Sequence, residues 1–599
     1  MNTRNSLWLG GLLLAASCGG GGGGSGGSGA AAGPKAPLNL VAGVRGGDVV
    51  LDWSASAGAV EYRVYGSDQP DVVRDAANLI ATVTTPGAAL SGVPAGVPVF
   101  VAVSAKNSKA ESALSAEVSL TLGPDPLLGD QWHLLNLGQA GGTPGEDVNA
   151  LAVWNAGITG DGVRIAVVDD GLELGHEDLS GNVVPGKSHN YLDNSTNPST
   201  GSHGTACAGV AASDDGNAVG GMGVAFDARL VGYNLLEELT DSNTVNAMTR
   251  DAAANHISSN SWGAPDGFGI PQPSANSWRN AVESGIVNGR GGLGTVYLWA
   301  AGNGALSAQG ATDNSNLDGQ ANFHGVIAIG AVGDDGVKAF YSENGANVLV
   351  VAPSMGRANH AITTVDRTGP IGINDGTNPN DYADTNYTNT FNGTSSATPL
   401  AAGVVALMLE ANPALTQRDV RWILAASARI NDALDPDWGV NGVGLPINHK
   451  YGFGVVDAEA AVALAQAWVN VGPQKRVLTP LRQPNLPIPD ADLVGVSDVI
   501  TVANSNITEL EYVQITFDAD NHSFSGDLEI VLTSPSGTTS VLAEVHAQPQ
   551  GSVPYDAFVF GCARLLGEPA DGVWTLSVRD LAPQDVGTFK SWRLELFGS

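Results

Sequence analysis

The sequence predicts a central α/β domain built on a parallel sheet, with an all-β domain on each side. The apolar run VRIAVV at 163–168 does not alternate with polar residues, as expected of a parallel strand buried on both faces. The strings at 48–56 and 572–580 do alternate, which is typical of half-buried antiparallel strands. A chain of 599 residues has ample length for several domains.

The composition is that of a globular and strongly acidic protein. Hydrophobic residues make up 43% of the chain, charged residues 15%, and the net charge is −33. Phosphates would be repelled by this charge, so we exclude nucleic acid as a partner and expect a soluble monomer. Three cysteines provide no disulfide framework.

The first 35 residues read as a targeting segment and a tether. Arg4 precedes an apolar stretch too short to span a bilayer, and residues 1–17 form the predicted signal peptide. The string AASC resembles a bacterial lipobox, which implies cleavage before Cys18 and lipid on its thiol. Residues 18–35 are rich in glycine and form a flexible tether. We therefore expect an exported lipoprotein of the bacterial cell surface or outer membrane, with release from the cell or an ordinary secretory signal as the alternatives.

Residues 36–122 form the predicted N-terminal β domain. Alternating strings such as VEYRVYGS carry Trp53, Tyr62 and Tyr65 at the spacing of core aromatics. The segment resembles a fibronectin type III domain, and the resemblance implies an Ig-like β-sandwich. No residue in it suggests catalysis, so we interpret it as a spacer or a binding module.

Catalysis is predicted by three short strings and one asparagine. VVDDG at 167–171 places Asp169 at the end of the buried strand, where a carboxylate can orient an imidazole. His203 begins HGTACAG, a small-residue helix that can pack closely on the sheet. Ser395 in NGTSSATP opens an apolar helix whose dipole favours developing negative charge. Asn303 follows another apolar strand and can donate its side-chain amide.

These strings, in this order, resemble the subtilisin superfamily of serine proteases. The resemblance covers residues 125–469, includes YGFGVVDA at 451–458, and implies a subtilisin-like α/β fold. It further implies that Asp169 orients the base, His203 is the general acid and base, Ser395 is the nucleophile and Asn303 completes the oxyanion hole.

Further strings narrow the resemblance to the kexin and furin-like convertases. They are the second acid in VVDDG, the stretch NGRGGLGTVYLWAAGNG at 288–304, and SWGAPDG at 261–267. The resemblance implies a specificity pocket walled by Ser261, Trp262 and Gly263. It also implies two pocket acids, Asp266 and Asp318. Paired carboxylates in a narrow pocket select Arg or Lys before the cut.

The resemblance leaves the preference for a second basic residue weak. Asp170 alone favours such a residue one position further back. Thr200 stands where dibasic convertases carry an acid, and FGIPQPS at 268–274 replaces further acids. We therefore predict a firm preference for Arg or Lys directly before the cut and a weak preference for a second basic residue one position further back.

The same resemblance implies two calcium sites, made of hard oxygen ligands that suit this ion. The first comprises side chains of Asp125, Asp178 and Asn217 with backbone carbonyls of Asp214, Val219 and Gly221. The second comprises Asp266, Asp313 and Glu343 beside the specificity pocket. The alternative is that all of these are solvated loop acids in an acidic chain.

Residues 476–599 follow a proline-rich linker and form the predicted C-terminal β domain. Leu528, Ile530 and Leu532 share one face of a strand, and the string at 572–598 alternates in the same way. These strings resemble the P-homology domain of kexin and furin-like enzymes, which implies a β jelly-roll.

Two functions of different classes agree with the sequence. The first is a calcium-dependent serine endopeptidase that cleaves exported polypeptides after basic residues. The second is a catalytically inactive surface adhesin whose β domains bind a partner. The complete set of Asp169, His203, Asn303 and Ser395 favours the enzyme, with a broad-specificity subtilisin-like protease as the alternative within that class.

Overall fold

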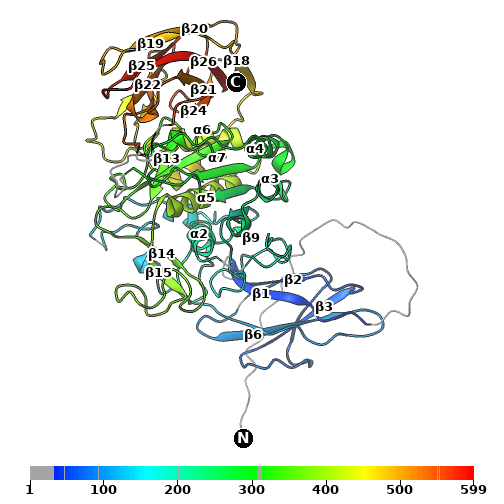
Figure 1. The fold of residues 1–599 in the computed structure, drawn as a ribbon. Coiled ribbons are helices and arrows are strands. Elements are labelled where there is room, and N and C mark those ends of the chain that lie inside the picture. The colour runs from blue at the N-terminus through cyan, green and yellow to red at the C-terminus, as the bar shows by residue number, and fades with distance from the viewer. Residues whose placement is uncertain are drawn as a thin grey trace.

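The computed structural model describes residues 33–45, 48–91, 93–139, 141–198, 201–305, 313–548, 551 and 553–599. Three parts follow one another along the chain, with a central α/β domain between two β domains (Figure 1). Cys18, nearly all of the predicted tether and Thr200 lie outside the described residues.

The N-terminal β domain consists of two antiparallel sheets. One has the order β1(Leu38–Arg45)-β2(Asp48–Ser54)-β5(Ala88–Leu90), and the other the order β4(Leu79–Val83)-β3(Glu61–Ser67)-β6(Pro98–Lys106)-β7(Val118–Thr121). Trp53 and Tyr62 pack edge to face at 5.5 Å in a core shared by both sheets. Tyr65 points to the opposite face of β3 from Tyr62, so it packs in a separate small cluster with Val72 and Ala102.

The central domain is built on a six-stranded parallel sheet. Its order is β13(Val348–Pro353)-β12(Val326–Val332)-β11(Val296–Ala300)-β10(Ile257–Asn260)-β8(Arg164–Val168)-β9(Arg229–Tyr233). The sequence prediction of a buried parallel strand at 163–168 is confirmed by β8, which is buried along nearly its whole length. Ile165 and Val167 pack into one core and Ala166 and Val168 into another, because successive side chains leave opposite faces of the sheet.

Helices cover both faces of this sheet (Figure 1). They are α1(Leu151–Asn155), α2(His203–Ala212), α3(Asp241–Thr249), α4(Asn276–Asn288), α5(Thr394–Ala411), α6(Gln417–Ser427) and α7(Ala458–Ala467). Small hairpins add β14(Ile362–Val365) with β15(Tyr387–Phe391), and β16(Gly439–Val440) with β17(Pro446–Ile447). Helix α5 is long and apolar enough to cross a membrane, but 83% of it is buried, which is typical of a central core helix.

The C-terminal domain consists of two antiparallel sheets around one core. The first has the order β18(Lys475–Leu478)-β26(Gly587–Gly598)-β21(Leu510–Asp520)-β24(Phe558–Cys562), with β19(Leu486–Ile488) also paired to β26. The second has the order β20(Val496–Val502)-β25(Gly572–Asp580)-β22(Leu528–Thr533)-β23(Thr539–Ala543). Leu528, Ile530 and Leu532 all face the core, as their alternation predicts.

The three parts are joined by polar contacts as well as by the chain. Asp52 of the N-terminal domain forms an ion pair of 2.8 Å with Arg229 of β9. Arg418 of α6 pairs with the buried Glu511 of β21, and the Arg421 guanidinium lies 5.0 Å from the Tyr512 ring. The C-terminal domain thus packs directly on the central domain.

Candidate active site

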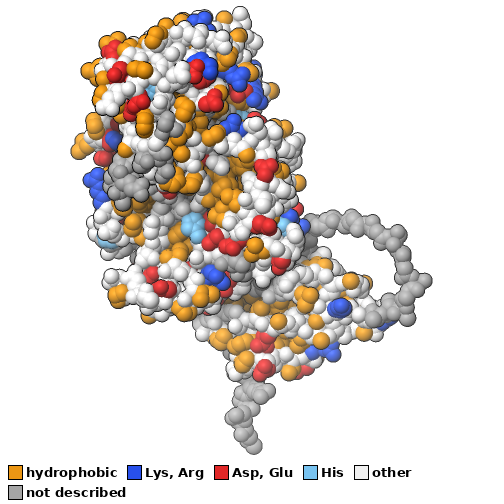
Figure 2. Space-filling model, in the orientation of Figure 1, with side chains coloured by type: hydrophobic (Ala, Val, Ile, Leu, Met, Phe, Trp, Pro, Cys, Tyr) orange, Lys and Arg blue, Asp and Glu red, His pale blue; other side chains and the backbone are white. Residues whose placement is uncertain are grey.

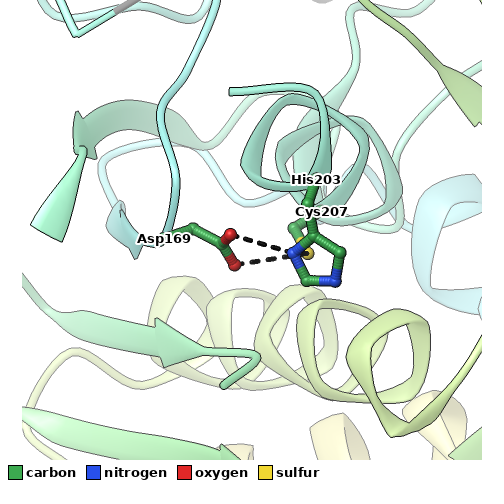
Figure 3. A group of neighbouring side chains, drawn as sticks. All are labelled: Asp169, His203 and Cys207. Atoms are coloured by element: carbon green, nitrogen blue, oxygen red, sulfur yellow. Dashed lines mark hydrogen bonds and ion pairs between the residues drawn. The ribbon is translucent and has the colours of Figure 1, made fainter. Parts of the chain in front are cut away.

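The candidate site lies where β8 and β11 end and where α2 and α5 begin. Asp169 follows the last residue of β8 and is 1% exposed, and His203 is the first residue of α2. Carboxyl ends of parallel strands share one edge of a sheet, so the fold brings side chains from distant motifs to one place. Figure 3 shows the Asp169 side chain, at the end of β8, facing the imidazole of His203 at the start of α2.

Asp169 and His203 form a close hydrogen bond. Asp169 Oδ1 lies 2.9 Å from His203 Nδ1. A carboxylate can only accept here, so Nδ1 carries the proton and Nε2 is left as the base. Burial alone lowers the pKa of His203, but the Asp169 carboxylate outweighs burial and raises that pKa well above 6.5. This is the electrostatic arrangement that a general base needs in order to hold a proton during reaction.

Ser395 lies at the N-terminus of α5, as predicted. Gly393 precedes the helix with a φ of 84°, a conformation that favours glycine, and Ser395 is 9% exposed. Its Oγ donates to the carbonyl of Ser261 at 3.3 Å, while the Ser261 hydroxyl donates to the Ser395 carbonyl at 3.0 Å. The Ser395 hydroxyl therefore bonds to the backbone of the Ser261 loop, next to the predicted specificity-pocket residues.

Asn303 is oriented by the same helix end. Its Oδ1 accepts from the Thr394 amide at 2.8 Å and from the Thr394 hydroxyl at 3.0 Å. With the carbonyl oxygen anchored, Nδ2 is the donor that remains for an oxyanion. Thr394 was not identified from the sequence as a positioning residue, although it lies within the NGTSSATP string.

A buried thiol lies directly behind the Asp169–His203 pair (Figure 3). Cys207 Sγ is 3.9 Å from both Asp169 Oδ2 and His203 Nδ1, and 3.5 Å from the Ser395 carbonyl. Burial raises the pKa of this thiol, so it stays protonated and packs as the sequence predicts. Across the described ranges, these three residues form the one group of three or more carboxylate, imidazole or thiol ligands whose ligand atoms lie within 4.8 Å of one another.

The predicted specificity-pocket residues lie together beside Asn303. Trp262 packs on Trp299 with ring centroids 4.6 Å apart. A Cβ on Gly263 would lie 2.4 Å from Asp318 Oδ2, so any side chain at position 263 would collide with this acid. Asp318 accepts three backbone hydrogen bonds, from Ala264, Gln320 and Ala321, yet burial raises its pKa to about 6.

Four carboxylates line one small cavity of about 10 Å³ at this place: Asp266, Asp313, Asp318 and Glu343. Asp266 Oδ1 accepts a hydrogen bond from the backbone amide of Asn303 at 3.1 Å. The cavity therefore borders the predicted oxyanion donor. Burial, together with the neighbouring Asp313 and Asp266, raises the pKa of Glu343 well above its ordinary value. Their oxygens are of the type that binds a hard cation, although no three of these carboxylates bring ligand oxygens within 4.8 Å of one another in the described residues.

Side chains of the other predicted ion site also lie next to one another. Asn217 Nδ2 donates to Asp178 Oδ1 at 2.8 Å, and Asp125 accepts from the amides of Gly216 and Asn217. Burial and the charges of Asp214 and Asp125 raise the pKa of Asp178 well above its ordinary value. Among the other predicted ligands, Gly221 donates its amide to Asp178, and Val219 donates its amide to Asn217 Oδ1.

Asp170 has a structural partner besides its predicted contact with substrate. Its carboxylate accepts from the Gly204 amide at 2.7 Å and from the His203 amide at 3.2 Å, at the start of α2. Burial raises its pKa to about 6. The side chain thus caps the helix that carries the base.

A larger cavity lies beside the strand that leads to Ser395. It measures about 620 Å³ and is lined by side chains of β15 and the following turn, including Thr390 and Asn392, and by Tyr382 and Trp132. Phe391, between Thr390 and Asn392, packs edge to face on the His203 ring at 5.5 Å. Strand β15 thus presents Thr390 and Asn392 to the cavity and Phe391 to the His203 ring, on opposite faces of the strand.

Contacts from the C-terminal domain reach the acidic cavity, and sequence reasoning missed them. His546 Nε2 lies 2.8 Å from the Gly269 carbonyl, and Asn314 Nδ2 donates to Glu544 at 3.1 Å. Gly269 in turn donates its amide to Asp313. No local motif signals these residues, because the contact joins segments more than 200 positions apart.

Comparison with known proteins agrees with this geometry. The subtilase family model matches residues 160–454, and the proprotein convertase P-domain model matches residues 510–596. The chain is 35% identical over 499 residues to neuroendocrine convertase 2 of Drosophila melanogaster, covering 79% of this chain and 72% of that protein. It is also 35% identical over 482 residues to PC3-like endoprotease variants B and A of Hydra vulgaris, spanning 77% of this chain but only 64% and 57% of their lengths.

A solved structure is similar over most of the chain. The serine protease of Aeromonas sobria, in a complex with the chaperone ORF2, superimposes with a TM-score of 0.72 and 27% identity, covering 80% of this chain and 96% of that one. Sequence relatives, domain order and site geometry agree: the chain belongs to the subtilase family of serine proteases, is related to the neuroendocrine convertases, and carries a proprotein convertase P domain.

Proposed function

We propose that the protein is a calcium-dependent serine endopeptidase that cleaves exported polypeptides after Arg or Lys. The observation that carries the proposal is the position of Asp266 and Asp318, which line a narrow cavity next to Asn303 and the catalytic serine. A guanidinium or ammonium that approaches from the side of Asn303 would meet these two carboxylates at the mouth of the cavity, whereas a neutral side chain would leave them unpaired.

The reaction follows from the contacts of the site. His203 Nε2 takes the proton of the Ser395 hydroxyl as Oγ attacks the carbonyl carbon, and Asp169 stabilises the imidazolium that forms. Asn303 Nδ2 donates to the resulting oxyanion, aided by the N-terminus of α5. The imidazolium then protonates the leaving amine, and water, activated by the same base, hydrolyses the acyl-enzyme.

The large cavity beside β15 suits the part of the substrate beyond the cut. The leaving amine must pass the imidazolium, and β15, which packs Phe391 on the His203 ring, lines this cavity with Thr390 and Asn392. Its lining is rich in amide and hydroxyl groups, which can hydrogen-bond an extended peptide.

Calcium is proposed for both acidic clusters. Asp266, Asp313 and Glu343 would hold one ion beside the specificity pocket. Asp125, Asp178 and Asn217, with backbone carbonyls of Asp214, Val219 and Gly221, would hold the other. The ions would neutralise buried carboxylates and so fix the loops that carry them.

The remaining parts of the proposal concern location and accessory domains. The two N-terminal sheets and their shared core support a fibronectin type III-like sandwich that acts as a spacer or binding module. A lipid on Cys18 would tether the enzyme at the cell surface or outer membrane, and the net charge of −33 favours approach of basic substrates. The relation to convertases supports a secretory or extracellular setting.

The test is cleavage of matched peptides that carry Arg, Lys, Leu or Phe before the cut, with calcium and with chelator. We expect calcium-dependent cleavage after Arg and Lys that is lost in Ser395→Ala. Equal rates for Leu and Arg would indicate a broad-specificity protease. No cleavage by folded protein would favour the binding-protein alternative.

A further inference from the structure

A second polar cavity lies between the catalytic domain and the P domain, away from the acidic specificity pocket. It measures about 390 Å³. Helix α4 forms the catalytic-domain wall with Arg279 and Glu283, and strands β18, β21 and β26 form the opposite wall with Arg476, Gln514 and Arg593. Lys and Arg side chains gather where the P domain borders α4, at the upper right of Figure 2.

The acids of this cavity are already engaged. Arg476 Nε bonds to Glu595, and its second nitrogen lies 3.7 Å from Glu283. Glu283 also bonds to His324 Nε2 at 2.7 Å. Both carboxylates that line the cavity are therefore neutralised by partners other than Arg279 and Arg593.

Arg279 and Arg593 have no carboxylate within 4.0 Å among the described residues. Each uses only its Nε, Arg279 toward Ser274 Oγ at 2.9 Å and Arg593 toward Thr516 Oγ1 at 3.4 Å. Within the described ranges, no protein acceptor bonds to the terminal nitrogens of either guanidinium group, although the chain carries 60 acids against 27 basic residues. Burial without a compensating acid lowers the pKa of Arg279.

Gln514 adds an independent observation. Gln514 is only 6% exposed and lines the same cavity. In the part of the chain that the structure describes, its side-chain amide has no hydrogen-bond partner and is accessible from the open cavity, where a ligand can reach it. A ligand that accepts hydrogen bonds would satisfy this amide and both arginines together.

We propose that this cavity binds an oxyanion, the phosphate, sulfate or carboxylate group of a small ligand, between Arg279 and Arg593. Guanidinium groups bind such anions through paired, charge-assisted hydrogen bonds. The cavity has the size of a small-molecule site rather than that of a single water. Because Arg279 belongs to the catalytic domain and Arg593 to the P domain, the anion would bridge the two and stabilise their contact.

The experiment measures binding of inorganic phosphate, sulfate and acetate to the full chain by calorimetry, with thermal unfolding followed in parallel. Sodium chloride at equal ionic strength is the reference. We expect saturable phosphate binding with a Kd on the order of 1 mM and a Tm that rises with occupancy. The acetate titration shows whether a carboxylate suffices or a tetrahedral anion is required.

Two variants and a control locate the site. Arg279→Gln and Arg593→Gln should each weaken phosphate binding roughly tenfold or more, since each removes a charge-assisted pair. Arg482→Gln is the matched control, because Arg482 pairs with Asp498 elsewhere on the P domain. Absence of saturable binding to the unmodified chain, or unchanged affinity in both folded variants, would overturn the proposal.

Discussion

At the scale of single residues, the site depends on side chains that are held by hydrogen bonds from neighbouring motifs. Asn303 is the clearest case, since both bonds that fix its carbonyl come from Thr394, one residue before the nucleophile. Asn303 and Ser395, the proposed oxyanion donor and nucleophile, are therefore fixed to the same helix end. A change in either should affect the transition state more than the binding of substrate.

Replacing Asn303 with alanine removes one donor to the oxyanion. We expect Asn303→Ala to lower kcat by roughly 100- to 1000-fold with little change in KM. Steady-state kinetics on an Arg peptide measure this effect. Asn288→Ala, an exposed asparagine at the end of α4, is the control and should leave kcat unchanged.

Asp318 should give the selectivity for basic residues a pH dependence. Its pKa is raised to about 6, so the carboxylate is charged above pH 6 and neutral below it. The preference for Arg over Leu should therefore fall as pH drops through 6. The ratio of kcat/KM for the two peptides is the measurement, because titration of His203 cancels in it.

The matched variant is Asp318→Asn, which should reduce the Arg-over-Leu ratio roughly tenfold or more and make it independent of pH between 5 and 8. A ratio in the variant that still falls through pH 6 would assign the effect to another group, such as Asp170, whose pKa is also about 6.

At the scale of elements, the P-domain loop that carries His546 supports the proposed specificity pocket. Both ring nitrogens of His546 face carbonyl oxygens, of Glu544 at 2.7 Å and of Gly269 at 2.8 Å. Carbonyls only accept, so both bonds exist together when the ring is protonated. Gly269 belongs to the loop whose amides bond Asp313, and the P domain thus positions an acid of the proposed ion site.

Loss of this contact should loosen the pocket without touching the triad. We expect His546→Ala to raise KM for an Arg peptide about threefold to tenfold, with a smaller change in kcat. Val545→Ala, its exposed neighbour, is the control. An equal loss of activity on Arg and Leu peptides would instead indicate general destabilisation.

At the scale of the whole molecule, buried carboxylates make stability depend on a bound cation. Burial raises the pKa of Asp178 and Glu343, so the ion-free folded state retains protons that the unfolded chain releases. Lowering the pH therefore stabilises the ion-free folded state relative to the unfolded one. The proposed calcium ions should matter most when these acids are ionised.

Chelation should lower Tm more at pH 8 than at pH 6. We expect a decrease of about 5 °C or more at pH 8, measured by calorimetry of Ser395→Ala to avoid self-digestion. Magnesium in place of calcium is the comparison, and it should restore little of the loss, because Mg²⁺ sheds its water reluctantly. A Tm that is insensitive to chelator at both pH values would contradict the calcium proposal.

From the sequence came the parallel sheet, the P domain through its family resemblance, and the four residues that we propose as catalytic. This was feasible because each signal is local: the unbroken apolar run before Asp169, the small residues after His203 and the glycine before Ser395 act within a few positions of the group they place. Only the tertiary structure showed that Asp170 caps α2, that Thr394 orients Asn303, that His546 reaches the pocket loop, and that Arg279 and Arg593 line one cavity. Those contacts join segments that no short-range pattern relates, and packing of whole domains decides which of them meet.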